Sequence, residues 1–399
     1  MKIESLSKRS MPIAMLICLS VFFVLIVYPL WYLVIYAIGG LESPSLSNIL
    51  NLFNNPFYLK ALLNTLFLAT ASTALCSCIS IPLAWILSHT NTPFRNFLKK
   101  MTIYPFFLTP LFVAQSWALL LGSKGLINSI LEPIGVVIRF PIYSIWGIVW
   151  VHSLAYVPLV FLYVSTGLES MDPSLEEALY LSGAGTVETL FRVTLPSVAP
   201  SVLSGIVIMF SFSIGIFSVP IILGLPKGIY TLGTVIYELA VHSPPNYTQA
   251  SALAVWFFIP AIALIYVQRR ILSGRKFITI TGKGFRPRLT DLGRLKYVTF
   301  GICLLFVLIN FLPLTALVLT SFMPYYSFSA LLSTFSFTLS NYEFAFFSYP
   351  SSSRCILNSL LLASSVATIG CFLCLTISTL IERTKLKGRG VLDYFTMVP

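Results

Sequence analysis

Apolar runs of about 18 residues or more recur along the chain, and they constrain the fold more than any other feature. Helices of that length match the hydrocarbon thickness of a bilayer. Charged residues make up only 10% of the 399 residues, too few to cover a surface that faces water. The sequence therefore predicts an all-α fold, a polytopic membrane helical bundle, and argues against a soluble enzyme or a disordered chain. A β-barrel is disfavoured because its strands would alternate apolar and polar residues.

Eight complete runs predict eight membrane spans, and a ninth begins near Tyr394 and reaches the chain end at Pro399. The first run follows basic residues, as in a signal peptide, but it is much longer than a signal h-region. We therefore expect an uncleaved first span. The eight predicted spans are residues 11–38, 59–87, 102–121, 142–167, 198–223, 249–268, 297–321 and 356–381.

The Lys and Arg residues indicate how the spans are oriented. With the N-terminus in the cytoplasm, 20 of the 25 fall in cytoplasmic segments and five fall outside. Membrane proteins retain positive residues on the cytoplasmic side, so this distribution predicts the orientation. It also accounts for the net charge of +12 without a nucleic acid partner. The basic stretch Arg269–Lys296 is then a cytoplasmic linker that can contact anionic membrane lipid.

An internal repeat divides the chain. Asn64–Pro105 aligns with Asn358–Pro399 at a constant offset of 294 residues, with Thr, Arg and Pro in register. The alignment pairs the second span with the eighth, so the repeat has six helices and both halves enter the membrane in the same direction. The predicted domains are residues 1–268, a first repeat with a cytoplasmic loop at 168–198; residues 269–296, the linker; and residues 297–399, the start of a second repeat with two full helices and the beginning of a third.

The loop at residues 168–198 holds five of the 13 acidic residues and predicts two short helices. Asp172 can cap the first helix, and Glu176 and Glu177 lie in its first turn, where a helix favours negative charge. Gly183 can end this helix because glycine tolerates the left-handed conformation that a C-terminal turn requires.

The first of these helices carries an apolar stripe at Leu175, Ala178 and Leu179, three and four residues apart. The second helix repeats the spacing, and Pro196 then opens the fifth span. Helices this short are marginal alone, so the stripe needs a partner. The membrane surface, other helices of the chain and a groove on a soluble subunit all remain possible.

Within the loop, Glu177-Ala178-Leu179, Gly183, Val193 and Leu195-Pro196 resemble the EAA loop of permeases from binding-protein-dependent ABC importers. The residues between Gly183 and Val193 number nine, as in the family, while Leu179 and Val193 replace Ala and Ile. In that family the loop forms a coupling helix that seats in a groove of a separate ATP-binding subunit. The resemblance implies an ATPase-coupling loop with key residues at Glu177, Ala178, Gly183, Leu195 and Pro196.

The resemblance also implies a non-catalytic permease subunit in the cytoplasmic (inner) membrane of a prokaryote. The sequence contains no GxxxxGK[ST] phosphate loop, so we expect the chain to bind no cofactor and a partner to use the ATP. The expected partners are an ABC ATP-binding subunit present as a homodimer, a periplasmic or surface-anchored substrate-binding protein, and membrane lipid.

The fused two-half layout resembles the ferric-iron type of permease, as do the segments Tyr230–Tyr237, Pro244–Tyr247 and Thr281–Arg288. Ferric iron is therefore the expected substrate, while related permeases for phosphonate, thiamine or polyamine remain alternatives. A secondary transporter driven by an ion gradient is a second hypothesis, although no acidic residue lies clearly in mid-span. A membrane-bound enzyme ranks last, because no nucleophile, base and metal constellation is present.

The second repeat stops early, and the repeat partner of the loop would lie beyond Pro399. We therefore expect a fragment, a degraded gene or a protein whose remainder is encoded downstream. The chain as given is not expected to transport substrate alone.

Small residues at Ser204, Ser211, Gly215 and Ser218 are spaced to share one face of the predicted fifth span. Two interpretations are open. The residues can let neighbouring helices pack closely, as small residues do in membranes, or they can line the substrate pathway, because the fifth span of this family follows the coupling loop.

A few polar residues lie within or near the spans. His152 is expected to be hydrogen-bonded to a neighbouring helix, and Asn64 and its repeat partner Asn358 are expected to cap helices. Cys371 and Cys374 are expected to be small packing residues. No cluster resembles a ferric site, so the sequence supports no metal site in this chain.

Overall fold

The computed structural model describes residues 20–21, 23–40, 44–131, 135, 140–273, 289–324 and 337–383. Within these residues the regular secondary structure is helical, apart from one isolated β-bridge between Thr90 and Thr290, so the all-α prediction is confirmed. The chain divides into two compact units. The larger is Leu50–Phe337, and the smaller combines Met1–Ile49 with Thr338–Pro399.

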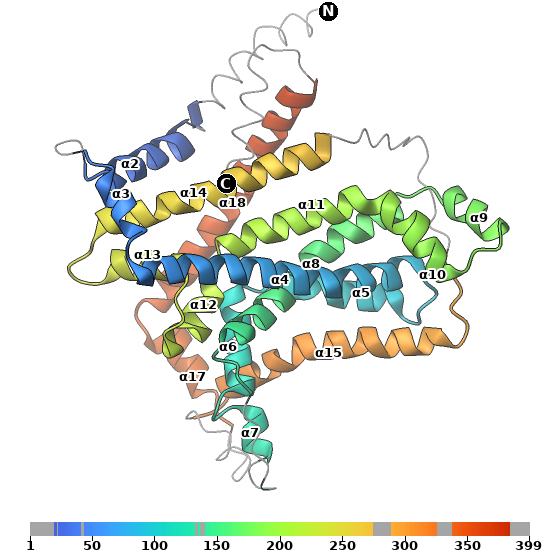
Figure 1. Cartoon of the computed structure of the whole chain (residues 1–399). Coiled ribbons are helices and arrows are strands. Elements are labelled where there is room, and N and C mark those ends of the chain that lie inside the picture. Colours follow the sequence, from blue (N-terminus) through green and yellow to red (C-terminus); the bar gives the residue numbers. More distant parts are fainter. Residues whose placement is uncertain are drawn as a thin grey trace, which may run out of the picture. The chain divides into compact units, whose positions relative to one another are not determined.

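Three long helices form the centre of the larger unit. α4 (Pro56–His89), α8 (Ile145–Glu169) and α11 (Leu195–Ile214) pack against one another, and Figure 1 shows them running alongside each other. Ser153 of α8 donates a hydrogen bond to the Ser72 carbonyl of α4 at 3.1 Å. Small hydroxyl side chains of this kind let the backbones of membrane helices approach and also satisfy their own polar groups.

α8 and α11 approach each other closely at Gly167. A Cβ atom built there would lie 2.6 Å from both Cβ and Oγ of Ser201, which is closer than carbon atoms can approach. Further along the same contact, a Cβ atom at Gly205 would lie 3.2 Å from Cβ of Tyr163. Glycine is therefore required at Gly167 for the two helices to pack at this distance.

The remaining helices of the larger unit surround this centre. α15 (Leu295–Ser321) lies beside α5 (Arg95–Ile103) and α6 (Pro110–Leu121), and α13 (Leu232–Val241) packs on α4 and on α14 (Tyr247–Ser273). α15 opens the predicted second repeat, yet it belongs to the same compact unit as the helices of the first. Figure 1 shows α13 at one end of α4 and the short helices α9 and α10 at the other.

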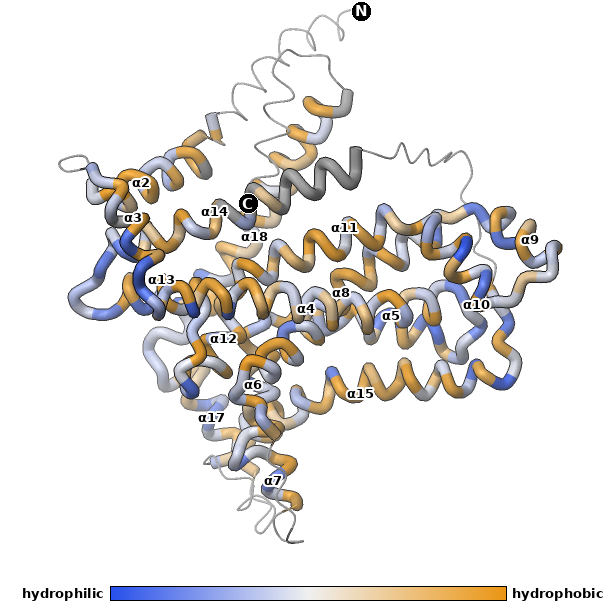
Figure 2. The backbone as a smooth tube through the Cα atoms, viewed as in Figure 1, coloured by the Kyte–Doolittle hydropathy of each residue, from blue (hydrophilic) through white to orange (hydrophobic). Residues whose placement is uncertain are grey.

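Six helices in the described part of the chain are long and apolar enough to cross a membrane, and Figure 2 shows hydrophobic residues along most of their length. They correspond to six of the eight predicted spans. The predicted span 249–268 lies within α14, and of the predicted span 11–38 the description includes η1 (Phe23–Val27) and α2 (Tyr28–Ala37). The predicted ninth span lies outside the described residues. The six helices are Pro56–His89, Pro110–Leu131, Ile145–Glu169, Thr186–Ile214, Leu295–Ser321 and Ser352–Ile381.

The third span differs from its prediction. The run at 102–121 is not one helix, because a 3₁₀ turn at Tyr104–Phe107 separates α5 from α6. Pro110 favours an extended conformation at Thr109, which has φ −68° and ψ 141°. Hydropathy cannot detect this interruption, because Pro105 and Pro110 stand among apolar neighbours.

Asn64 does not cap a helix, contrary to the prediction. It lies inside α4, and its amide Nδ2 donates a hydrogen bond to the Tyr230 carbonyl at 2.9 Å. The neighbouring Thr65 hydroxyl accepts a hydrogen bond from the Leu232 backbone N–H at 2.9 Å. Asn55 caps α4 instead, because its side chain accepts a hydrogen bond from the backbone of the first helical turn. The polar side chains of Asn64 and Thr65 therefore hold the segment that leads into α13.

The smaller unit contains η1 and α2 from the N-terminal part of the chain and α18 (Ser352–Arg383) from the C-terminal part, preceded by α17 (Ser340–Glu343). Most residues of α18 are exposed within the described chain, including Asn358. Asn358 lies inside this helix and therefore does not cap it, which corrects the prediction made for Asn358 as well.

Candidate functional site

The loop between α8 and α11 carries the residues that resemble the EAA motif, and its first helix begins as expected. α9 (Ser174–Leu181) follows Asp172, whose Oδ1 accepts a hydrogen bond from the Ser174 backbone N–H at 2.9 Å. Glu176 and Glu177 lie in the first turn of α9, where the helix dipole favours carboxylates. The predicted cap and first turn are confirmed.

Gly183 ends α9 in the left-handed conformation, with φ +91°. The backbone N–H of Gly183 donates a hydrogen bond to the Tyr180 carbonyl at 3.0 Å, and that of Ala184 donates one to the Leu179 carbonyl at 3.3 Å. These bonds satisfy carbonyl groups that the last turn of a helix leaves free. Because L residues other than glycine are strained at this φ, the predicted need for glycine at Gly183 is confirmed.

The second half of the loop is not a separate short helix, contrary to the prediction. α10 (Thr186–Thr189) continues through a π-helical turn, η4 (Leu190–Thr194), directly into α11. Pro196 lies within this continuous helix, where its ring excludes the usual hydrogen bond to the residue four positions earlier. A π turn widens the backbone hydrogen-bond spacing and accommodates such a defect. The sequence predicts that Pro196 leads into the fifth span, whereas the continuous helix already begins at Thr186.

The loop presents an apolar surface outward. Leu181 is 89% exposed and Phe191 is 65% exposed, although burial of such side chains is favourable by about 2 kcal/mol each. Exposed apolar patches of this kind mark sites of association. Below, the term loop surface denotes these exposed side chains: Leu175, Ala178, Leu181, Val187 and Phe191.

The two adjacent carboxylates of α9 have different environments. Glu177 is exposed beside Ala178, whereas Glu176 is only 5% exposed. Oε2 of Glu176 lies 2.8 Å from Nε2 of His89, the last residue of α4. Oε1 of Glu176 accepts a hydrogen bond from the Thr194 hydroxyl of η4. We refer to His89, Glu176 and Thr194 as the Glu176 latch.

Ionisation of Glu176 is favoured in this environment. Burial raises the pKa of its carboxyl group. The hydrogen bonds from His89 and Thr194, together with the electrostatic attraction of His89, lower this pKa by more than burial raises it. The resulting pKa lies below the ordinary value of 4.5. Sequence reasoning missed the latch because His89 and Glu176 are 87 residues apart and share no motif.

The residues proposed from the sequence to line a pathway do not lie on one helix. Ser204 and Ser211 are on α11, but the helix ends at Ile214, Gly215 follows it, and Ser218 begins α12 (Ser218–Leu223). The expected continuous face is therefore interrupted. Gly215 faces open space, because a Cβ atom built there would have no neighbour within 4 Å. Whether these four residues line a pathway stays a prediction.

His152 behaves as expected for a buried membrane histidine. Its Nε2 lies 3.0 Å from the hydroxyl oxygen of Ser213 on α11, and its ring packs edge-on against Tyr156 with centroids 4.8 Å apart. Tyr156 in turn contacts the Phe212 ring. The predicted hydrogen bond to a neighbouring helix is confirmed, and it fixes α8 to the end of α11.

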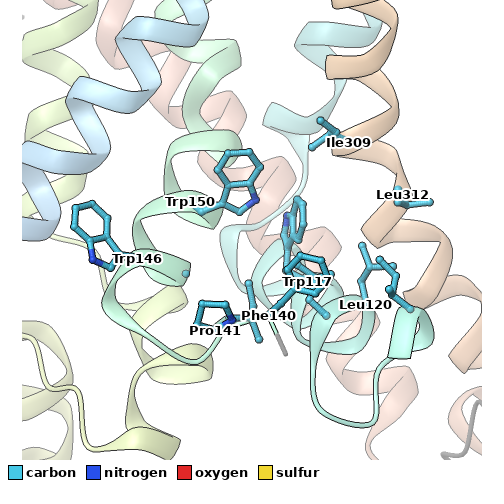
Figure 3. A pocket seen from close by; sticks show the side chains of 12 residues that line it. Trp117, Leu120, Phe140, Pro141, Trp146, Trp150, Ile309 and Leu312 are labelled. Carbon is cyan, nitrogen blue, oxygen red and sulfur yellow. The ribbon is translucent and has the colours of Figure 1, made fainter. Parts of the chain in front are cut away.

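An apolar cavity of about 390 Å³ lies between α6, α8 and α15. Figure 3 shows Trp117 and Trp150 close together, with Ile309 and Leu312 on α15; the two indole rings are 6.1 Å apart and nearly perpendicular. The lining of this cavity contains almost no polar atoms. A cavity of this chemistry does not suit a charged substrate.

Among the described residues, no group of three His, Cys, Asp or Glu side chains could hold a metal ion. Cys371 and Cys374 are exposed free cysteines on α18. The expectation that they are small packing residues stays a prediction. Two thiols alone do not complete a typical zinc site, which takes four ligands.

The fold and the loop define a class: a polytopic helical membrane protein with an exposed amphipathic loop at one end of its long helices. The chain belongs to the family of binding-protein-dependent transport system inner membrane components, whose sequence model matches residues 5–277. The resemblance inferred from the loop is thereby confirmed. Membership in a family of transport components also agrees with the expectation that the chain is not an enzyme.

Two curated relatives show the range of the family. The chain is 26% identical over 395 residues to the ferric transport system permease protein FbpB of Actinobacillus pleuropneumoniae, covering 96% of this chain and 56% of that protein. It is 28% identical over 232 residues to the spermidine/putrescine transport system permease protein PotB of Haemophilus influenzae, covering 57% of this chain and 79% of that protein. The chain thus spans little more than half the length of the ferric relative.

Solved structures share the fold. A bacterial ABC transporter involved in the import of the acidic polysaccharide alginate superposes with a TM-score of 0.59 at 20% identity, covering 69% of this chain and all of that one. A bacterial alginate ABC transporter in complex with an alginate pentasaccharide-bound periplasmic protein gives a TM-score of 0.58 at 21% identity, covering 70% of this chain and 99% of that one.

Proposed function

We propose that the protein is the membrane-spanning subunit of an ATP-driven importer, and that a separate ATPase docks on the loop surface. The observation that carries this proposal is the outward orientation of Glu177, Ala178 and the exposed side chains of Leu181 and Phe191. An amphipathic helix that exposes its apolar residues fits a groove on a partner protein. The chain itself binds no cofactor in this proposal, and the ATPase, as a homodimer, binds the ATP.

The proposed orientation puts the N-terminus and the loop in the cytoplasm, because 20 of the 25 Lys and Arg residues then lie on that side. ATP is available there. On the opposite side, a periplasmic or surface-anchored binding protein would deliver the substrate. A periplasmic protein is present in the related alginate transporter complex, which supports this arrangement for the fold.

Ferric iron is the proposed substrate. The ferric transport relative aligns with 96% of this chain, whereas the polyamine relative aligns with 57%. A polyamine is the second candidate, because the shorter alignment has a similar identity of 28%. Uptake of radioactive iron and of radioactive spermidine by the same reconstituted transporter would separate the two. Iron uptake supports the first proposal, and uptake of spermidine alone overturns it.

The coupling role of the loop is tested with Gly183→Pro. Proline has φ near −65°, whereas Gly183 has φ +91°, so the variant should misdirect the loop surface. We expect at least about a tenfold loss of ATP-driven uptake in proteoliposomes, because a displaced coupling element loses most of its binding energy.

Gly185→Pro provides the matched control, since Gly185 already has φ −79° and open space around it. Both variants should reach the membrane in normal amounts. Normal uptake by Gly183→Pro would contradict the coupling role, and a similar loss in both variants would show that the loop tolerates no proline at all.

A further inference from the structure

The Glu176 latch connects the loop to the end of α4. His89 is 3% exposed and Glu176 is 5% exposed, and the two side chains lie 2.8 Å apart. Thr194 binds the same carboxylate from η4. A displacement of α9 alone would leave these buried polar groups without partners, which is unfavourable. The loop and the end of α4 are therefore expected to move together.

The residue at the end of α4 is also bound to the segment that enters α15. The Thr290 backbone N–H donates a hydrogen bond to the His89 carbonyl at 2.8 Å, and the Asn91 N–H donates one to the Thr290 carbonyl at 3.2 Å. The two segments thus form an isolated parallel β-bridge between Thr90 and Thr290. His89 therefore takes part in both contacts: its side chain binds the loop and its backbone binds the segment before α15.

Side chains strengthen this pairing. The Asn91 amide Nδ2 donates a hydrogen bond to Asp291 Oδ1 at 2.5 Å, while Asn91 Oδ1 accepts one from the Leu292 N–H at 3.1 Å. The hydroxyls of Thr92 and Thr299 lie 2.8 Å apart, which reaches into α15 itself. We call this set of contacts the linker junction.

Asp291 is ionised at neutral pH. The Gly293 backbone N–H and the Asn91 amide both donate hydrogen bonds to its carboxylate, and these lower its pKa below the ordinary value of 3.8. A second carboxylate at position 91 would therefore lie against an existing negative charge and would repel it.

We propose that the Glu176 latch and the linker junction form one continuous connection, by which displacement of the loop is passed through the end of α4 to α15. Glu176, His89 and Asn91 are positioning residues in this proposal. It rests on the proposed function in so far as a docked ATPase supplies the displacement. The segment before α15 then takes part in coupling instead of serving only as a tether between the repeats.

The mechanical connection is tested without transport, by hydrogen–deuterium exchange on the purified protein in detergent. Glu176→Ala should raise the exchange rate in the loop and also in peptides that contain Thr90 and Thr290. We expect about a tenfold increase at the backbone N–H groups of Asn91 and Thr290, because loss of the latch makes local opening easier. The matched control is Glu188→Ala, which removes an exposed carboxylate that pairs with Arg192 on the same loop. It should change exchange only near Glu188. An effect of Glu176→Ala confined to the loop would overturn the proposal.

The functional consequence is tested by exchanging two side chains of the linker junction. Asn91→Asp places two carboxylates together and should lower the amount of substrate moved per ATP hydrolysed by about tenfold, because coupling then loses its positioning contact. Adding Asp291→Asn should restore most of the ratio, since it removes the second carboxylate and lets the amide of residue 291 donate a hydrogen bond to the carboxylate at position 91. The assembled transporter in proteoliposomes is used, with equal amounts of complex.

The outcomes separate the two proposals. If the unmodified complex shows neither docking of an ATPase on the loop surface nor ATP-driven uptake, the proposed function fails, and the exchange experiment still decides whether the loop is connected to Thr290. If the unmodified transporter moves substrate but Asn91→Asp has a normal ratio, the inference is wrong while the proposed function stands. A loss that Asp291→Asn does not reverse would also overturn the inference.

Discussion

Two adjacent glutamates in the first turn of α9 differ in their surroundings, and the sequence motif predicts only one of them. Glu177 was predicted from the motif to act in the loop, and it is exposed. Glu176 was treated only as part of an acidic first turn, and it is the buried residue that binds His89 and Thr194. A motif shows residue types along the chain, so it predicted Glu177 and Gly183. It contains no information about which distant residue lies beside Glu176.

The Glu176 latch should make stability depend on pH. The pKa of Glu176 is lowered in the folded protein, so its contribution is present above pH 4.5 and is lost as pH falls through the lower, folded pKa. Glu176→Gln should therefore lower the free energy of unfolding by about 1–3 kcal/mol near pH 6. The difference between variant and parent should shrink at a pH well below 4.5, as the parent carboxylate becomes protonated.

Thermal unfolding of both proteins in detergent, followed at the two pH values, measures this difference. Glu188→Gln serves as the control, because Glu188 forms an exposed pair with Arg192. A Tm difference for Glu176→Gln that stays constant across the pH range would contradict the assignment of an ionised, buried carboxylate.

At the scale of helices, hydropathy predicted most of the long elements but not where they are interrupted or joined. Membrane-length helices follow from local composition, so six predicted spans correspond to helices in the described structure. The break at Tyr104–Phe107 and the continuous helix from Thr186 to Ile214 depend on how proline residues are accommodated. A proline in a sequence permits a helix start, a kink or a π turn, and only the surrounding packing selects among them.

The packing of α8 against α11 gives a prediction at this scale. Gly167→Ala would place a methyl group 2.6 Å from two atoms of Ser201. Overpacking of this kind should lower the free energy of unfolding by about 1–3 kcal/mol. Adding Ser201→Gly removes both of the atoms that clash, so the double variant should recover most of the lost stability.

The measurement is the thermal midpoint of the parent, both single variants and the double variant in detergent. Ser201→Gly alone should lower the thermal midpoint less than Gly167→Ala does, since it creates space instead of a clash. Additive losses in the double variant would show that the two residues are not in direct contact.

At the scale of the whole molecule, the sequence predicted a repeat with a boundary at the linker, whereas the compact units follow a different division. α15 opens the predicted second repeat but packs with helices of the first. Sequence repeats show how a chain was duplicated. They do not show which helices share a core, because that depends on contacts such as those of Asn91 with the segment before α15 and of Thr92 with Thr299 in that helix.

The proposed orientation predicts which exposed positions can be labelled from outside. In a cysteine-free background, Lys227→Cys should react with a membrane-impermeant maleimide in intact cells, since Lys227 lies on the proposed outer side. Ser182→Cys, exposed at the end of α9, should react only after the membrane is permeabilised. Labelling of Ser182→Cys in intact cells would show that the proposed orientation is wrong.

The continuous helix from Thr186 to Ile214 has a geometric consequence. Its 29 residues correspond to a rod of about 43 Å, at about 1.5 Å per residue. One end of the rod lies in the loop, and the other ends beside Gly215. A tilt of about 5° at the loop would carry the far end sideways by about 4 Å, roughly the diameter of a methyl group, if the rod stays straight at the 1.5 Å rise. A small angular change at the proposed ATPase interface would thus become a sideways displacement of about 4 Å at the far end of this helix.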